Sequence, residues 1–323
     1  MSCDFIAAAD DEGRRLDRIL RKALRGLPLS AIHRLLRQRR ILVDGKPAAP
    51  SARVQTGQTI TIPDGISDDT RYENSAPPSQ RKTGGLQILF EGSGLLVLNK
   101  PSGIAVHRED KSPHGAPHLA ASVLAYLAPK LPPSLSFKPG PLHRLDKPSS
   151  GIIVFSTNLA GAKQFSALMQ ERKIKKIYLA LVEGKLDRAE TWQDELARDQ
   201  TRRKTFTAAG DNTQTKTALS RVKPLAKSAA CTLILVEIQT GRPHQIRAQA
   251  AARGHPLLGD KKYGAKFCPE NGFLLHAWRM EFPADVSFPP SIQAPLPERF
   301  AGKIREIFGE DVLLELAPEM NRT

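Results

Sequence analysis

Cysteine is scarce in this chain of 323 residues. Its three copies, Cys3, Cys231 and Cys268, are scattered and form neither a CxxC pair nor a Cys/His ligand spacing. An odd cysteine count without a pairing pattern is typical of a reducing compartment, and no structural zinc site is indicated. We therefore expect no bound metal.

Long hydrophobic runs are also missing. The longest, 86–98 and 231–238, are interrupted by polar residues or are too short to cross a bilayer. Residues 1–11 contain three aspartates and no basic stretch, which is unlike a signal peptide. These absences predict a cytoplasmic protein with no membrane partner.

Acidic residues are outnumbered by basic ones. The 48 Lys and Arg against 33 Asp and Glu give a formal net charge of +15. A basic surface of this kind displaces counterions from a phosphate-rich partner such as a nucleic acid. The same charge also fits a basic protein that binds no polyanion, and it does not separate RNA from DNA.

Composition along the chain predicts four parts. Residues 1–67 form a compact basic unit, and 68–85 are polar and contain Pro and Gly, which indicates a linker. Residues 86–310 mix strand and helix patterns and form the large domain. Residues 311–323 are expected to be a loosely held tail.

The basic unit predicts two helices and a small strand unit. Apolar residues at helical spacing mark a first helix within 16–24, and Ser30 is the expected N-cap of a second. A tight turn at Asp44 and Gly45 and a short alternating strand over 59–62 follow. The inner face of the second helix carries three apolar residues, Ile32, Leu35 and Leu36.

Four arginines gather at the end of the second predicted helix: Arg34, Arg37, Arg39 and Arg40. Their alternative role is to solvate the helix and match its dipole, but their density favours RNA binding. The unit resembles the ribosomal-protein-S-four-like (alpha-L) RNA-binding domain through residues 15–20 and 30–46. Such modules occur on many RNA-directed proteins, and the resemblance implies a grip on structured RNA.

The large domain predicts an α+β fold. Its strands are connected like hairpins, which indicates a mixed, mainly antiparallel sheet flanked by helices. Two polar stretches, 109–118 and 129–141, are expected to be surface loops. The expected strands are 86–90, 95–98, 152–155, 176–182 and 232–238, and the expected helices are 119–127, one capped by Asn158, and 245–252.

Two segments carry residues suited to chemistry. Asp146 lies between basic residues on a Gly/Pro-rich segment, 143–151, that leads into a buried strand. Segment 240–247 follows a strand and opens a helix, a natural site for phosphate or carboxylate, with Arg247 one turn in. Taken singly, either segment is equally explained by a loop salt bridge or by solvated arginines.

Together the two segments predict a site. A buried carboxylate needs a cation to stay ionised, and the planar fork of an arginine is its best partner. No Ser/His/Asp set, P-loop or GxGxxG accompanies them, so hydrolase, ATPase and dehydrogenase functions lack their parts.

Residues 86–282 closely resemble the RluA family of pseudouridine synthases, which isomerise uridine within RNA. The resemblance rests on ordered motifs and departs at Gln249, where relatives often carry His, and in the two loops. The motifs are residues 100–107, 143–151, 176–180, 240–247, 254–260, 263–264 and 274–277.

The resemblance implies roles for individual residues. Asp146 acts on the target uridine, Arg247 pairs with it, and Tyr178 packs on the target base. Arg144 replaces the flipped-out uridine or contacts the distorted RNA. Three further residues of these motifs are expected to contact RNA, His143, Arg242 and His244.

The reaction remakes a carbon–nitrogen bond as a carbon–carbon bond at the same sugar, so no cofactor or metal is required. Asp146 serves either as nucleophile at the sugar or as base at its neighbouring carbon. The expected protein is a monomer that acts on large-subunit ribosomal RNA, with transfer RNA as the alternative. Its rivals are a non-catalytic RNA-binding assembly factor, which the presence of all three site residues disfavours, and a hydrolase, which needs a second catalytic carboxylate or metal ligands.

Overall fold

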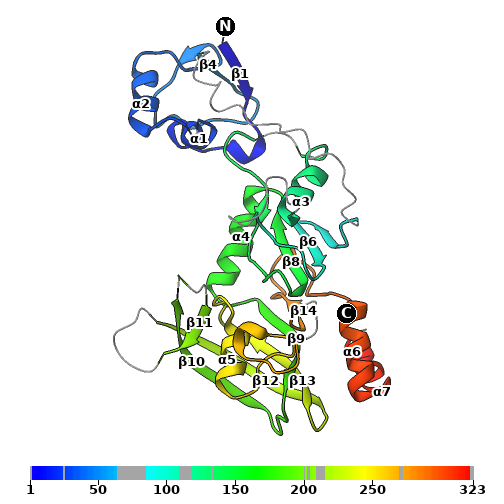
Figure 1. The fold of residues 1–323 in the computed structure, drawn as a ribbon. Coiled ribbons are helices and arrows are strands. Elements are labelled where there is room, and N and C mark those ends of the chain that lie inside the picture. The colour runs from blue at the N-terminus through cyan, green and yellow to red at the C-terminus, as the bar shows by residue number, and fades with distance from the viewer. Residues whose placement is uncertain are drawn as a thin grey trace.

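The computed structural model describes residues 2–24, 26–63, 85–108, 118–131, 134–199, 201, 204–208, 215–268 and 272–320. The predicted linker lies outside these residues except for Gly85, as does the predicted loop 109–118 except for His118. The fold is α+β, with a four-stranded sheet in the N-terminal domain and an 11-stranded, mainly antiparallel sheet in the large domain (Figure 1).

The N-terminal domain has the predicted two helices and strand unit. Its sheet has the order β1-β4-β2-β3, and the predicted turn at Asp44 and Gly45 joins β2 to β3 with φ angles of 50° and 72°. Positive φ at both central residues is what a tight hairpin turn requires. The elements are β1 (Ser2–Ile6), α1 (Leu16–Ala23), α2 (Leu29–Arg37), β2 (Leu42–Val43), β3 (Lys46–Pro47) and β4 (Thr59–Pro63).

One predicted helix boundary is wrong. Helix α2 begins at Leu29 after an extended Pro28, so Ser30 lies inside the first turn and caps nothing. Pro28 occupies the N-cap position, and its extended backbone marks the residue before the helix. The predicted inner face is confirmed, since Ile32, Leu35 and Leu36 are buried.

The large sheet has the order β11-β10-β12-β13-β9-β14-β8-β6-β5, with β15 beside β14 and β7 beside β8. Its described pairs are antiparallel apart from β14 with β8. The strands are β5 (Ile88–Gly92), β6 (Leu95–Lys100), β7 (Gly140–Pro141), β8 (Ser150–Ser156), β9 (Lys175–Glu183), β10 (Glu190–Asp199), β11 (Lys204–Thr207), β12 (Lys216–Lys227), β13 (Cys231–Ile238), β14 (Leu275–Glu281) and β15 (Ser291–Gln293).

Helices cover both faces of this sheet. Apolar residues of α3 and α4 pack on β6 and β8 in one cluster, and those of α6 pack on β9 and β14 in another. The stretch expected as a tail contains α7, whose Leu316 is buried in the α6 cluster. No helix in the described ranges is both long and apolar enough to span a membrane. The helices are α3 (Leu119–Leu127), α4 (Leu159–Gln170), α5 (Gln245–Ala252), α6 (Glu298–Phe308) and α7 (Asp311–Met320).

The two domains touch through a buried aspartate. The Asp11 carboxylate is fully buried and accepts hydrogen bonds from the backbone N–H groups of Leu135 at 3.3 Å and Ser136 at 3.0 Å. The neighbouring Asp10 accepts from the N–H of Leu159, the first residue of α4, at 2.7 Å. Leu135 itself belongs to the hydrophobic core of the N-terminal domain. We call these interactions the domain contact.

Candidate active site

A buried lysine, Lys100, hydrogen-bonds to backbone carbonyls of the loop that carries Asp146 and of the neighbouring segment. The ammonium of Lys100 donates to the carbonyls of Pro101 at 2.8 Å, Ile104 at 2.9 Å and Lys147 at 3.2 Å. Burial lowers the pKa of Lys100 to about 8, against the opposing charge of Asp146. Lys100 therefore ties the segment after β6 to the residue that follows Asp146.

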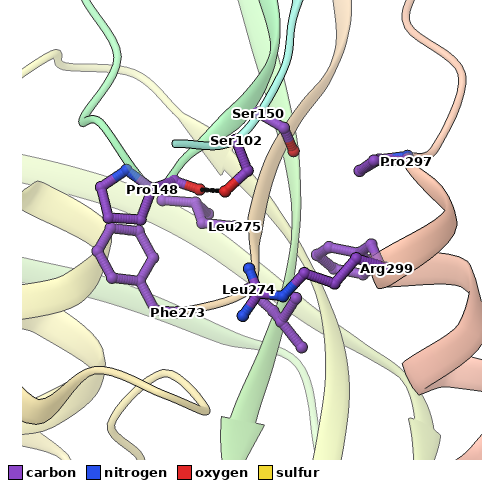
Figure 2. A pocket seen from close by; sticks show the side chains of 9 residues that line it. Ser102, Pro148, Ser150, Phe273, Leu274, Leu275, Pro297 and Arg299 are labelled. Carbon is purple, nitrogen blue, oxygen red and sulfur yellow. Dashed lines mark hydrogen bonds between the residues drawn. The ribbon is translucent and has the colours of Figure 1, made fainter. Parts of the chain in front are cut away.

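A second clamp acts one residue further along. The hydroxyl of Ser102 donates to the carbonyl of Pro148 at 2.6 Å (Figure 2). The cavity beside this bond, lined also by Phe273, Arg299 and Phe300, holds only about 20 Å³. It has room for a single water at most. It is therefore a small packing defect beside the loop and too small to bind a nucleotide.

Arg247 joins two carboxylates. Its Nη1 donates to Oδ2 of Asp146 at 2.7 Å, while Nε and Nη2 donate to the two oxygens of Asp260 at 2.6 and 2.9 Å. The guanidinium lies 4.8 Å from the ring centre of Tyr263 and 4.3 Å from that of Phe273. Burial alone would lower the pKa of Arg247, but the hydrogen bonds and charges of Asp260 and Asp146 raise it.

This geometry leaves one oxygen of Asp146 available. The side chain of Asp146 is 22% exposed, whereas Asp260 is 1% exposed and fully engaged. Oδ1 of Asp146 has Nε2 of His244 at 3.8 Å, beyond hydrogen-bond length. The arrangement presents one accessible carboxylate oxygen whose orientation is fixed from the other side.

The ring of His244 is oriented by its contact with Tyr263. Burial lowers its pKa to about 4, so the imidazole is neutral near pH 7. Its Nδ1 lies 3.0 Å from the hydroxyl of Tyr263, and that hydroxyl already donates its single hydrogen to the carbonyl of Thr205. These contacts orient the ring so that Nε2 faces the Asp146 carboxylate.

Tyr178 lies on β9 where two hydrophobic clusters of the large domain meet. Burial, and after it the charge of Asp146, raises the pKa of Tyr178 well above its ordinary value, so the phenol stays neutral. Its partners in register are Val236 on β13 and Ala277 on β14. The ring is thus fixed beside Asp146 by the centre of the sheet.

Comparison with known proteins supports what this geometry indicates. A family model described as RNA pseudouridylate synthase matches residues 94–252, and one described as S4 domain matches residues 14–60. The chain is 32% identical to ribosomal large subunit pseudouridine synthase C of Salmonella typhi over 80% of its length and 78% of that protein. It is 30% identical to ribosomal large subunit pseudouridine synthase D of Nitrosomonas europaea over 91% of its length and 85% of that protein.

The chain belongs to the RNA pseudouridylate synthase family. The predicted resemblance is confirmed, and with it the prediction of an enzyme. The fold agrees with a solved structure, human RNA pseudouridylate synthase domain containing 4, at a TM-score of 0.55 and 22% identity over 68% of this chain and 92% of that one.

In this pseudouridine synthase the other residues predicted to contact RNA differ in their exposure to solvent. Arg144 is exposed two residues before Asp146, and Arg242 is half-buried with Nε donating to the carbonyl of Thr217 at 3.0 Å. His143 faces inward, since its Nε2 accepts from the N–H of Val154 and its ring stacks on Phe165. Burial lowers the pKa of His143 to about 4. The four arginines of the N-terminal domain are all exposed, Arg34, Arg37, Arg39 and Arg40.

Gln249, the departure from the family pattern, is fully buried in a hydrogen-bond network. Its amide nitrogen donates to the carbonyl of Trp192 at 2.9 Å and to Asp194 at 2.7 Å, and its oxygen accepts from Ser220 at 2.7 Å. This pseudouridine synthase therefore uses Gln249 to fasten α5 to β10 and β12.

The sequence offers Asp260, with Glu109, only as a second carboxylate for a hydrolase and without a convincing pair, and it does not single out Phe273. Asp260 follows a glycine at φ 92°, which turns its carboxylate toward Arg247. That glycine within the motif is the one sequence signal that pointed to this position.

Proposed function

We propose that this pseudouridine synthase isomerises specific uridines of large-subunit ribosomal RNA, with Asp146 as the residue that acts on the target nucleotide. The observation that carries the proposal is the three-group arrangement of Asp146, Arg247 and Asp260. The relatives that are at least 30% identical over most of the chain are named for the large ribosomal subunit, which supports the choice of RNA.

The reaction breaks the bond between the sugar and a ring nitrogen of uracil and forms one to a ring carbon. Asp146 serves as nucleophile at the sugar carbon or as base at its neighbour. Either role requires an ionised carboxylate with a free oxygen, and the Arg247 pair leaves Oδ1 free for it. No electrons or phosphate groups are exchanged, so the chemistry needs no cofactor.

Other residues support the proposed step. The neutral phenol ring of Tyr178 offers a face on which the uracil can stack. Nε2 of His244, which lies beside Asp146, can form a hydrogen bond with the bound nucleotide. Arg144, which is exposed two residues before Asp146, is proposed to fill the gap left by the flipped-out base. Removing a base from the stack costs a few kcal/mol.

Two wider expectations go with this proposal. Asp146, Arg247 and Asp260 contact one another within the large domain, and action as a monomer is part of the proposal. A ribosomal RNA substrate also agrees with a cytoplasmic enzyme.

The test is incubation of the purified protein with unmodified transcripts of large-subunit ribosomal RNA and of transfer RNA, with no cofactor added. We expect pseudouridine at defined positions of the ribosomal transcript. Asp146→Asn should abolish its formation and leave RNA binding nearly unchanged, because the shape is kept and the ionised oxygen is lost. Modification of transfer RNA alone would overturn the substrate, and turnover by pure Asp146→Asn enzyme would overturn the residue.

A further inference from the structure

Lys176 is a largely buried lysine with no counter-charge among the residues that the structure describes. It lies on β9 two residues before Tyr178, so both side chains point to the same face of the sheet. The residue is 8% exposed, and among the described residues it has neither a carboxylate partner nor a hydrogen-bond acceptor. A buried lysine is normally paired.

The adjacent lysines show the ordinary arrangement. Lys175 pairs with Glu281 at 3.1 Å, and Lys173 pairs with Glu171 at 2.8 Å, both at exposed positions. Lys176, the most buried of the three, has no such partner. Its setting therefore differs from that of a surface lysine that solvates a strand.

Among the residues that the structure describes, the charge found near Lys176 is positive. A Cβ on Gly241, in the segment that leads to α5, would lie 3.9 Å from its ammonium. Arg172 is close enough that its charge adds to the effect of burial in lowering the pKa of Lys176. His143, which Lys176 also influences, is neutral at pH 7.

Arg172 occupies a position that favours glycine. It follows α4 with φ 57°, and the next residue, Lys173, donates its N–H back to the carbonyl of Leu168 at 2.9 Å, which closes the helix. Glycine is usual at this left-handed position because a side chain there is strained. An arginine at this strained position adds a second cation where Lys176 already lacks an anion.

We propose that Lys176 and Arg172 bind a backbone phosphate of the substrate RNA next to the target nucleotide. The proposal rests on the proposed function, because Tyr178, about 7 Å along the same strand face, is the expected platform for the target base. RNA carries one phosphate per nucleotide, so an anion reaches Lys176 when the base reaches Tyr178. The phosphate supplies the counter-charge that the protein lacks.

The experiment compares Lys176→Met with Lys175→Met. Lys175 is the matched control because it is adjacent, is of the same type, points to the opposite face and is already paired. Affinity for an unmodified large-subunit ribosomal RNA transcript is measured over a range of salt concentrations, together with the thermal midpoint of the free proteins.

For Lys176→Met we expect about tenfold weaker binding and a salt slope shallower by about 0.7 to 0.9, the value for one lost phosphate contact. Arg172→Gln should change both in the same direction. The thermal midpoint of Lys176→Met should not fall, because an unpaired buried charge is removed. Lys175→Met should keep the wild-type slope.

An unchanged salt slope for Lys176→Met would overturn the proposal, whatever the affinity. A lower thermal midpoint with that unchanged slope would show a lysine that only supports the fold. This experiment measures RNA binding and not turnover, so its failure can be told apart from failure of the proposed function. The proposed function fails if the wild-type enzyme forms no pseudouridine in ribosomal RNA.

Discussion

At the residue scale, the proposed reaction depends on which carboxylates accept hydrogen bonds from the N–H groups of Arg247. Two of its nitrogens are bound to Asp260, and only Nη1 reaches Asp146. Asp260 therefore orients the guanidinium through two hydrogen bonds. Asp146 is oriented by one hydrogen bond and keeps an oxygen free to react.

Lysine cannot reproduce this arrangement, because its ammonium has no planar fork. We expect Arg247→Lys to slow single-turnover pseudouridine formation at least about tenfold, which corresponds to about 1.4 kcal/mol. Arg253→Lys is the control, since Arg253 follows the same helix and pairs with Asp194 at 3.0 Å away from Asp146. A near-wild-type rate for Arg247→Lys would show that the pair does not support the reaction.

Part of this site was open to prediction from the sequence. A carboxylate before a buried strand and an arginine in the first turn of a helix suggested a pair, and the structure brings Asp146 and Arg247 together. Asp260 and Phe273 contact Arg247 only once the segments after α5 have folded, and the motif around Asp260 does not predict that contact. The inward orientation of His143 was equally hidden, because the adjoining Arg144 points to solvent.

At the element scale, α4 is placed by a contact between two glycines. A side-chain carbon at Gly161, in the first turn of α4, would lie 2.4 Å from the carbonyl oxygen of Gly94 in the β5–β6 turn. Asn158 caps the same turn of the helix, accepting from the N–H of Gly161 at 2.8 Å. The helix therefore rests directly on backbone, with no space between.

This contact reverses the usual effect of replacing a helical glycine. Gly161→Ala should destabilise the protein by about 1 to 3 kcal/mol, because the new methyl group meets backbone atoms. Gly302→Ala in α6 should stabilise it by up to about 1 kcal/mol, since its nearest neighbour is a flexible side-chain oxygen at 3.8 Å. Chemical denaturation of both variants is the measurement. A stabilised Gly161→Ala would mean that α4 stands further from the turn.

The elements that the sequence predicted are those whose pattern is local. Apolar strands such as β8 and the capped helix α4 were predicted within a few residues. Strand β10 was not, because Trp192, Leu196 and Ala197 are its only buried residues and do not alternate regularly. Strand β1 was missed for a related reason, since it is stabilised by pairing with β4 and not by a buried face of its own.

At the scale of the whole molecule, the arginines of the N-terminal domain lie far from the helix that carries Arg247 (Figure 1). The arginines of α2 belong to the domain at one end, and α5 lies toward the other (Figure 1). An RNA that touches both must span the length of the enzyme. The domain contact through Asp11 therefore fixes how far the target nucleotide lies from the part held by the N-terminal domain.

Removal of that charge should loosen the enzyme without unfolding either domain. Asp11→Asn weakens hydrogen bonds to backbone N–H groups, and charged hydrogen bonds of this kind contribute about 1.5 to 3 kcal/mol. We expect a larger radius of gyration in small-angle X-ray scattering and weaker RNA binding.

Asp4→Asn, an exposed aspartate on β1, is the control for the loss of one negative charge. Equal scattering curves for Asp11→Asn and wild type would show that other contacts hold the domains together.

The domain contact also bears on how such enzymes can exchange parts during evolution. A domain attached only by a tether can be transferred to another protein without change elsewhere. Here Leu135 completes the core of the N-terminal domain, and Asp10 of that domain supplies the acceptor for the first N–H of α4. Transfer of the RNA-binding domain would leave an apolar residue exposed on the donor enzyme. The residues on both sides of the contact are thus expected to be inherited as one set.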